Sequence, residues 1–257
     1  MEILVLNLMP NKIDTENHLK LSLNKKGGKV NLTFLRTESY QSKNTDLDYL
    51  NQNYKVFSEI YDKNFDGFIC TGAPVETLPF ESVVYIKELN QIMQWARENT
   101  NSSYYICWGA NAALFYFYGI KKIIYEKKFS GIFEHKITDP NSKAMKGLSG
   151  KIKIPVSRFA GVRKDDIEAI KELSLLLYSD ESGPCLIENK LHNEYYNFNH
   201  FEYNADTLLK EYARDTNSGI AIDIPKNYFP NDDLNKTPIN CWKESGSIFF
   251  NNWLNNF

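Results

Sequence analysis

Short apolar runs alternate with segments of helical periodicity along the first half of the chain. The apolar runs predict buried strands over residues 2–8, 30–37, 65–71 and 103–107, and the periodic segments predict helices over 14–26, 80–98 and 109–118. Asp14 suits a helix N-cap, Gly27-Gly28 suit the end of that helix, and Gly119 suits the end of the third. Such alternation is typical of βαβ units, so we expect a parallel sheet covered by helices on both faces.

The pattern is less regular in the second half of the chain. Strands are predicted over residues 152–159, 185–190 and 195–201, and helices over 165–176, 204–214 and 245–257. No linker rich in Pro, Gly or Ser, no low-complexity tract and no internal repeat divides the sequence. We therefore expect a single α/β domain over residues 1–257, with a mostly parallel sheet.

Charge and composition exclude several classes of function. The 257 residues include 30 basic and 32 acidic side chains, for a net charge of −2, without a Lys/Arg cluster that could follow a nucleic acid. No apolar run reaches the roughly 18–20 residues that span a bilayer. The first residues also lack the pattern of a secretory signal. We expect a cytoplasmic protein that binds neither nucleic acid nor membrane.

One of the four cysteines is a candidate nucleophile. The sequence has no C-x-x-C pair and no histidine at ligand spacing from a cysteine, so we expect no metal site. Cys107 ends an apolar strand and is followed by Trp-Gly-Ala and a predicted helix. This order is typical of a strand–helix elbow, where the helix N-terminus favours a thiolate. The alternative is an inert cysteine buried at the end of a strand.

His200 and Glu202 are the candidate partners of that nucleophile. They lie two residues apart at the end of a later predicted strand. A carboxylate beside an imidazole fixes its tautomer and raises its basicity, which suits a general base for Cys107. The alternative is a surface histidine beside a solvated carboxylate. The turn at residues 72–77 is either an oxyanion-binding loop or a simple turn. The weaker histidine candidates are His18, His135 and His192.

A series of motifs resembles one enzyme family over essentially the whole chain. In order, they are Asn7-Leu-Met-Pro-Asn-Lys12, Thr71-Gly-Ala-Pro74, Cys107-Trp-Gly-Ala110, Lys128-Phe-Ser-Gly-Ile-Phe-Glu-His135, Ser157-Arg158, Glu202-Tyr203, Tyr212-Ala-Arg-Asp215, Asn227-Tyr-Phe-Pro-Asn-Asp232 and Asn252-Trp-Leu254. Together they are similar to the homoserine O-acyltransferases of methionine biosynthesis, the homoserine O-succinyltransferase family. The resemblance implies a class I glutamine-amidotransferase-like fold, which is a flavodoxin-like α/β arrangement.

The resemblance also implies catalytic roles and an acyl donor. Cys107 would take the acyl group, and His200, oriented by Glu202, would be the general base. Members that transfer succinyl groups keep a glycine where this chain has Glu76. A glutamate would fill the space for the second carboxylate of a succinyl group and repel its charge. Acetyl-CoA is therefore the expected co-substrate, and no bound cofactor is expected.

The positions that match the substrate-binding ones of the family are Lys128, Ser157 and Arg214. Ser157 corresponds to a position linked to substrate choice. Arg214 corresponds to the arginine that holds the carboxylate of the amino acid, a role that suits the two parallel donors of a guanidinium. The implied activity is an L-homoserine O-acetyltransferase that forms O-acetyl-L-homoserine through an acetyl-cysteine intermediate. Its binding partners would be small-molecule substrates, and the possible assembly is a homodimer.

Departures from the family pattern leave several activities open. The usual Gly-His-Pro-Glu is Asn199-His-Phe-Glu202 here, the usual Gln after Cys-Trp-Gly-Ala is Asn111, and the family's N-terminal extension has no counterpart. L-Serine is the alternative acceptor, because one methylene changes discrimination by only about 1–3 kcal/mol. A homoserine O-succinyltransferase, a glutaminase-type cysteine hydrolase and a binding protein without activity also stay open.

Overall fold

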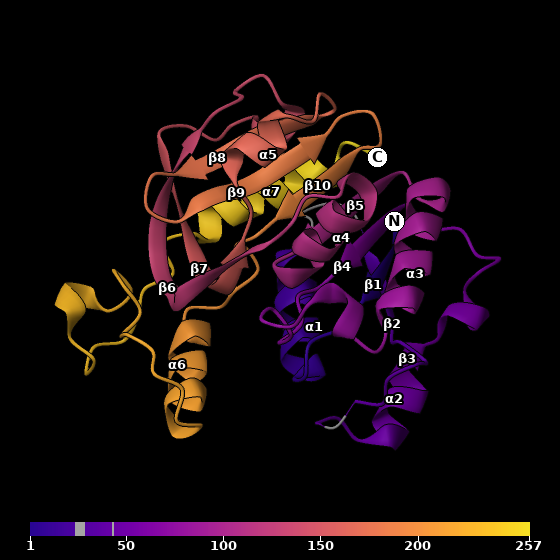
Figure 1. Cartoon of the computed structure of the whole chain (residues 1–257), viewed down its shortest axis with the longest axis horizontal. Coiled ribbons are helices and arrows are strands. Elements are labelled where there is room, and N and C mark those ends of the chain that lie inside the picture. The colour runs from indigo at the N-terminus through magenta and orange to yellow at the C-terminus, as the bar shows by residue number, and fades with distance from the viewer. Residues whose placement is uncertain (24–28, 43) are drawn as a thin grey trace.

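One ten-stranded sheet organises the part of the chain that the computed structural model describes, which is residues 1–23, 29–42 and 44–257 (Figure 1). The strand order is β3-β2-β1-β4-β5-β10-β9-β8-β6-β7. The parallel half contains β3 (Tyr54–Lys55), β2 (Asn31–Leu35), β1 (Glu2–Leu6), β4 (Gly67–Cys70), β5 (Ser102–Ile106) and β10 (Glu194–Asn197). The antiparallel half contains β9 (Gly183–Asn189), β8 (Leu173–Ser179), β6 (Ile123–Ile137) and β7 (Lys151–Gly161).

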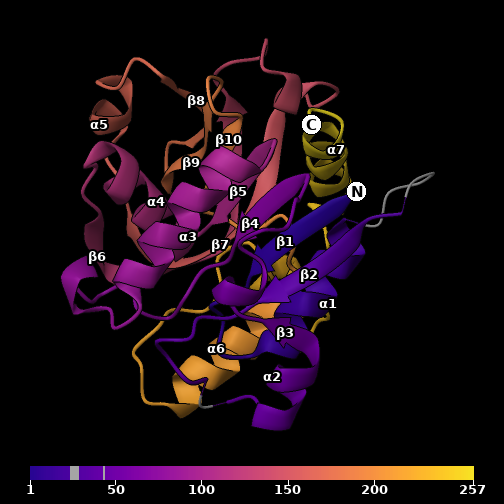
Figure 2. The same ribbon diagram turned by 90° about the vertical axis from the view of Figure 1, so that its right-hand side faces the viewer.

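Helices cover both faces of the parallel half. Helices α3 and α4 pack on one face, and α1 and α7 pack on the other (Figure 2). The α-helices of the described residues are α1 (Lys12–Ser22), α2 (Leu47–Asn53), α3 (Ile86–Asn99), α4 (Trp108–Tyr118), α5 (Lys164–Glu168), α6 (Thr207–Asn217) and α7 (Lys243–Leu254). Within the same residues, no helix combines the length and the apolar content needed to cross a membrane.

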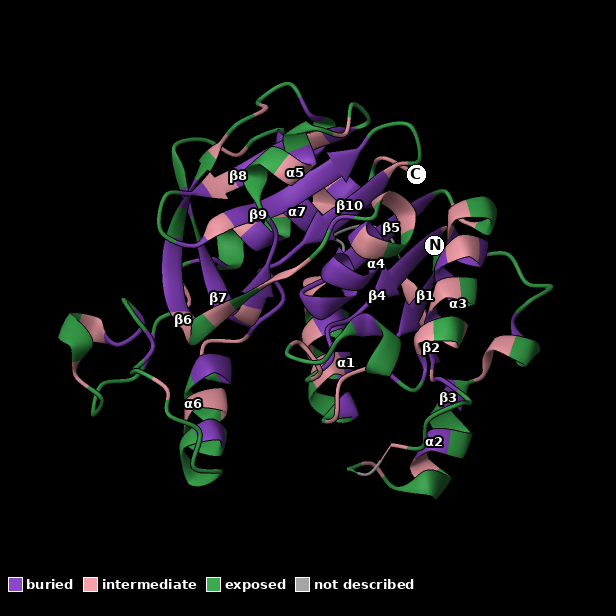
Figure 3. Ribbon diagram, in the orientation of Figure 1, coloured by how far each residue is buried: buried purple, intermediate pink, exposed green. Residues whose placement is uncertain are grey.

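The parallel strands are buried because their alternate residues belong to two different cores. In β1, Leu4 and Leu6 pack with α3 and α4, whereas Ile3 and Val5 pack with α1 and α7. Figure 3 shows the resulting buried band through the middle of the molecule. A strand buried on both faces has a nearly continuous apolar sequence. The predicted α/β fold with a mostly parallel sheet is confirmed.

The helix predicted over residues 165–176 is wrong. Helix α5 ends at Glu168, and the chain continues into strand β8 from Leu173. This apolar segment pairs antiparallel with β9, and at its end with β6, where both of its faces are covered. A short apolar run satisfies a buried strand as well as a helix, so periodicity alone does not separate them. The sequence pattern also missed β6, whose charged residues interrupt the apolar ones.

Smaller differences concern the ends of elements. Helix α1 has Asn11 as its N-cap, so Asp14 lies in the first turn instead of capping it. The helix ends at Ser22, and the end predicted at Gly27-Gly28 lies outside the described residues. Gly119 ends α4 in the left-handed conformation, with φ of 69°, as predicted.

A buried ion pair joins α3 to strand β10 at the middle of the sheet. Arg97 Nε and Nη2 donate to the two carboxylate oxygens of Glu194 at 2.8 and 2.6 Å, and the Glu194 side chain is fully buried. The same guanidinium lies 3.3 Å from the centroid of the Phe117 ring. The pair therefore fixes the helix on the sheet through two hydrogen bonds and an aromatic contact.

Arg97→Met is expected to lower the free energy of unfolding by about 3–5 kcal/mol, because it leaves the buried Glu194 charge without its cationic partner. Urea denaturation followed by circular dichroism measures the change. Lys55→Met is the control, since the Lys55 and Glu59 side chains are both about half exposed and such pairs contribute at most about 1 kcal/mol. Equal effects of the two substitutions would contradict the interpretation.

Candidate active site

Cys107 occupies a sharp elbow between β5 and α4. It is the residue before the helix, and its backbone angles are φ 52° and ψ −117°. A residue other than glycine adopts positive φ at a cost, and such strained positions are concentrated at functional sites. The backbone N–H of Cys107 donates to the carbonyl of Asn197 at 2.7 Å, so β10 holds the elbow from the neighbouring strand. The predicted elbow is therefore present.

Two glycines allow the chain to approach this elbow closely. A Cβ atom on Gly109 would lie 2.7 Å from the carbonyl oxygen of Thr71 and 2.9 Å from that of Cys70. A Cβ atom on Gly72 would lie 3.1 Å from the Cβ of Cys107. The glycine two residues after the cysteine is thus required by the packing of α4 against the end of β4. The loop that contains Gly72 therefore packs directly against Cys107.

The environment of the thiol disfavours its ionisation. Burial raises the pKa of Cys107 well above its ordinary value, and the nearby carboxylate of Glu76 raises it further. The guanidinium of Arg158 and the backbone N–H of Trp108 act in the opposite direction. A thiol in this environment needs a base to become a nucleophile.

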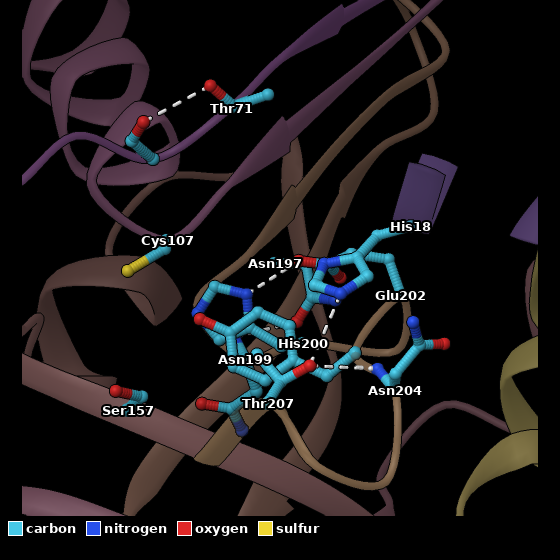
Figure 4. A network of polar contacts seen from close by, with 12 residues as sticks. His18, Thr71, Cys107, Ser157, Asn197, Asn199, His200, Glu202, Asn204 and Thr207 are labelled. Atoms are coloured by element: carbon cyan, nitrogen blue, oxygen red, sulfur yellow. Dashed lines mark hydrogen bonds and ion pairs between the residues drawn. The ribbon is translucent and has the colours of Figure 1, made fainter. Parts of the chain in front are cut away.

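His200 and Glu202 form a buried hydrogen-bonded pair. Nδ1 of His200 lies 2.6 Å from Oε1 of Glu202 (Figure 4). The imidazole stacks on the ring of Tyr203, with 4.0 Å between the two ring centroids. With Nδ1 engaged, Nε2 is the nitrogen left for proton transfer, and it has no hydrogen-bond partner within the described residues. The predicted contact between His200 and Glu202 is confirmed.

No hydrogen bond joins the Cys107 sulfur to His200 in the described part of the chain. Sγ instead donates to Oε1 of Glu76 at 3.6 Å, while Oε2 of Glu76 accepts from the backbone N–H of Phe159 at 3.2 Å. Burial raises the pKa of this carboxyl group. Lys122 Nζ donates to the backbone carbonyls of Glu76 and Leu78 and holds the loop that carries the carboxylate. The candidate position for donor specificity therefore touches the candidate nucleophile.

Lys128, Ser157 and Arg214 meet at two carboxylates of α6. Lys128 Nζ lies 2.7 Å from an oxygen of Asp215 and 3.8 Å from one of Glu211. The hydroxyl of Ser157 donates to the same Glu211 oxygen, and Arg214 Nε donates to Asp215 at 2.7 Å. The structure thus brings together three residues that are far apart in the sequence. The sequence motifs included Asp215 without a role and did not include Glu211, although the i, i+4 spacing of the two residues places them on one helix face.

A cleft of about 170 Å³ lies beside His200 and helix α6, and the lining that the described residues form includes neither Cys107 nor Lys128 nor Ser157. Its lining comes from the start of α1, the Gly72 loop, the end of β5, the residues around His200 and helix α6. His200, Glu202 and Arg214 are among the lining residues. His18, a weaker candidate in the sequence, also lines it, and its Nε2 lies 3.3 Å from the hydroxyl of Thr207. Burial lowers the pKa of His18.

The fold is similar to those of solved glutamine-amidotransferase structures. A glutamine amidotransferase from Thermotoga maritima matches with a TM-score of 0.66 and 10% identity, covering 99% of this chain and 96% of the other. A glutamine amidotransferase from Methylobacillus flagellatus matches with a TM-score of 0.66 and 11% identity, covering 100% and 94%. At this identity the likeness concerns the fold alone, and it confirms the predicted class I glutamine-amidotransferase-like arrangement.

Proteins with much higher sequence identity to this chain carry the name of one enzyme. The chain is 45% identical over 255 residues to a protein from Petrotoga mobilis named homoserine O-acetyltransferase, covering 99% of this chain and 82% of the relative. It is 44% identical to a protein of the same name from a Geobacillus species, covering 99% and 84%. The model of the homoserine O-succinyltransferase family matches residues 1–257. The chain therefore belongs to the homoserine O-succinyltransferase family.

Proposed function

We propose that this protein is an L-homoserine O-acetyltransferase that forms an acetyl-cysteine on Cys107. The observation that carries the proposal is the Glu76 carboxylate, 3.6 Å from the Cys107 sulfur. A thioester carbonyl that reaches this sulfur must place its acyl group beside that carboxylate. An acetyl group adds no charge there, whereas a succinyl group would add a second carboxylate against the first. The names of the curated relatives support the same donor.

In the first half-reaction, His200 Nε2 takes the proton of the Cys107 thiol. The sulfur attacks the carbonyl carbon of acetyl-CoA, and the negative charge on the carbonyl oxygen is stabilised by backbone N–H groups of Trp108 and of the 73–76 loop. When the tetrahedral species collapses, the carbon–sulfur bond to CoA breaks and His200 returns the proton to the leaving thiolate. Glu202 keeps Nδ1 protonated throughout and stabilises the imidazolium.

In the second half-reaction, homoserine binds with its carboxylate at Arg214, whose side chain is half exposed in the cleft. His200 takes the proton of the homoserine hydroxyl, and the oxygen attacks the acetyl-cysteine. Collapse releases O-acetyl-L-homoserine and the Cys107 thiolate, which recovers the proton from His200. Lys128 and Ser157, held by the carboxylates of α6, complete the acceptor site.

Three alternatives keep the same nucleophile. L-Serine would change the acceptor, succinyl-CoA would change the donor, and water in place of the acceptor would make a glutaminase-type hydrolase. The fold likeness to glutamine amidotransferases motivates the last one, while the acidic group at the sulfur and the family relationship favour acetyl transfer. We further expect a cytoplasmic enzyme, on the sequence pattern described above, and the assembly to be tested is a homodimer.

Cys107→Ser is expected to leave a folded protein whose kcat for acetyl transfer is lower by roughly 10³-fold or more, because the nucleophile is lost. Mass spectrometry of the wild type with acetyl-CoA alone should show one added acetyl group on the peptide that contains Cys107. Cys241→Ser, at an exposed cysteine, is the matched control and should keep both the label and the activity. An active Cys107→Ala variant would disprove covalent catalysis.

Glu76→Gly is expected to raise the ratio of kcat/KM for succinyl-CoA to that for acetyl-CoA by about tenfold or more, because it removes both a repelling charge and the occupied space. Glu76→Gln removes the charge and keeps the volume, so it should shift the ratio less. Steady-state kinetics with both donors at saturating homoserine measure the shift. A wild type that prefers succinyl-CoA is the outcome that this interpretation does not allow.

Arg214→Ala is expected to raise KM roughly tenfold or more for homoserine and for serine alike, because both carry the carboxylate that it holds. The position of the hydroxyl relative to His200 must then decide between them, and a misplacement near 1 Å can cost about 100-fold. We expect homoserine to have the higher kcat/KM and Ser157→Ala to change the ratio. A clear preference of the wild type for serine would overturn the acceptor assignment alone.

A further inference from the structure

A second cavity, of about 380 Å³, adjoins the catalytic cleft and has no role in the chemistry described above. It lies beyond the carboxyl ends of β1 and β2 and beside the loop after β4. Asn7 and Leu8 belong to the first of these segments, Arg36 and Thr37 to the second, and Pro74 to the loop. In open α/β sheets, ligands bind at this edge. Met9 lines both this cavity and the catalytic cleft.

Two cationic side chains line the cavity, and they differ in their partners, since the carboxylate of Glu16 attracts Lys12 whereas Arg36 has no ion pair among the described residues. Arg36 and Lys12 line it, and the lining contributed by the described residues contains no Asp or Glu. Lys12 Nζ is already held by the carbonyls of Asn7 and Met9, at 2.6 and 3.4 Å. Arg36 forms no ion pair with the described residues, its side-chain contact to Asn51 is long at 3.5 Å, and its buried Nε has no partner. Arg36 therefore has donors left for an anionic ligand.

The remaining walls suit an aromatic ring and a hydrocarbon arm. The rings of Tyr40 and Tyr85 lie 5.7 Å apart at one side, and the exposed side chain of Val84 lies beside them. The backbone N–H groups before Tyr40 donate to the carboxylate of Glu88 on α3, at 2.7 and 2.9 Å, which fixes this loop on the helix. Aromatic faces and cations together are the surroundings that a nucleotide prefers.

The loop between the two sites connects this cavity to the nucleophile. Pro74, Val75 and Leu78 line the cavity, while Gly72 and Glu76 of the same loop lie against Cys107. A ligand whose charged end sits near Arg36 can therefore pass over this loop and present a thioester to the sulfur. A ligand that matches these features carries phosphates for Arg36, a base for the rings of Tyr40 and Tyr85, and an extended apolar arm that follows the loop.

A third cavity, lined by residues of β6 and of the 223–232 segment, provides a contrast. Its lysines have acidic partners, since Lys127 pairs with Asp223 at 3.1 Å and Lys226 pairs with Glu181. Its charges are balanced by the protein itself. The cavity at Arg36 differs from it, because Arg36 has no acidic partner among the described residues and apolar side chains form much of the remaining lining.

The geometry points to the cavity at Arg36 as the site for the nucleotide portion of the acyl donor, with its phosphates at Arg36 and its adenine at Tyr40 and Tyr85. The assignment rests on the proposed use of acetyl-CoA. The catalytic cleft is then left for the amino acid, so that the two substrates reach Cys107 from opposite sides of the loop after β4.

Arg36→Met tests this assignment by steady-state kinetics, with Arg163→Met at an exposed arginine as the matched control. We expect Arg36→Met to raise KM for acetyl-CoA about tenfold or more, from the loss of a charge-assisted contact, with KM for homoserine and kcat unchanged. With S-acetylpantetheine, which has no phosphates or adenine, the variant and the wild type should have equal kcat/KM. An unchanged KM for acetyl-CoA in Arg36→Met would overturn the site.

A second pair of variants tests the same assignment without changing Arg36. Val84 is 73% exposed, so Val84→Glu and Val84→Lys should both fold. The glutamate should raise KM for acetyl-CoA about fivefold by repelling the phosphates, and the lysine should not raise it. Equal KM values in these two variants would contradict the assignment.

Direct titration of CoA separates this inference from the proposed function. If the wild type turns over no acetyl-CoA, the proposed function fails, and calorimetry with CoA still tests the site. Weaker CoA binding by Arg36→Met than by Arg163→Met supports the site in either case. Equal binding by the two variants, or no binding of CoA by the wild type, overturns it.

Discussion

The left-handed backbone of Cys107 is the constraint on which the site depends. A residue other than glycine at φ 52° costs on the order of 1–3 kcal/mol, so the surroundings must hold it in place. They do so through the fully buried start of α4 at Trp108, the close contact at Gly109 and the hydrogen bond to Asn197. The consequence is a buried side chain at the carboxyl end of β5, with its sulfur at the carboxylate of Glu76.

This placement sets the electrostatic conditions of the reaction. The sulfur is buried beside Glu76, which keeps it protonated until a base acts. His200 is the base that we propose, since its Nδ1 is engaged by Glu202 and its Nε2 has no partner in the described structure. In the mechanism that we propose, the thiolate would form during the reaction, once binding of the donor has brought the sulfur and the imidazole into contact.

The sequence pattern predicted those parts of the fold and site that follow from local rules. Buried parallel strands have continuous apolar runs, and the expectation of chemistry at their carboxyl ends singled out Cys107, His200 and Glu202. The failure at residues 165–176 has a different origin, because a short apolar run in an antiparallel sheet has no distinctive period. Local rules could not predict the cluster of Lys128, Ser157 and α6, since antiparallel pairing of β6 with β7 and a long connection to α6 create it.

The two halves of the sheet carry different parts of the candidate site. Strand β10 is parallel to β5 and antiparallel to β9, so it joins the half that carries the nucleophile to the half that carries Lys128 and Ser157. Because the proposed acceptor residues Lys128, Ser157 and Arg214 belong to β6, β7 and α6, they can vary without changing the elbow at Cys107. Glu76 connects the halves, since one oxygen accepts from Cys107 and the other from the backbone of Phe159 in β7. A change in the position of β7 would therefore move the carboxylate at the sulfur, so that in the proposed enzyme a change at the acceptor residue Ser157 of β7 would also reach the position that selects the donor.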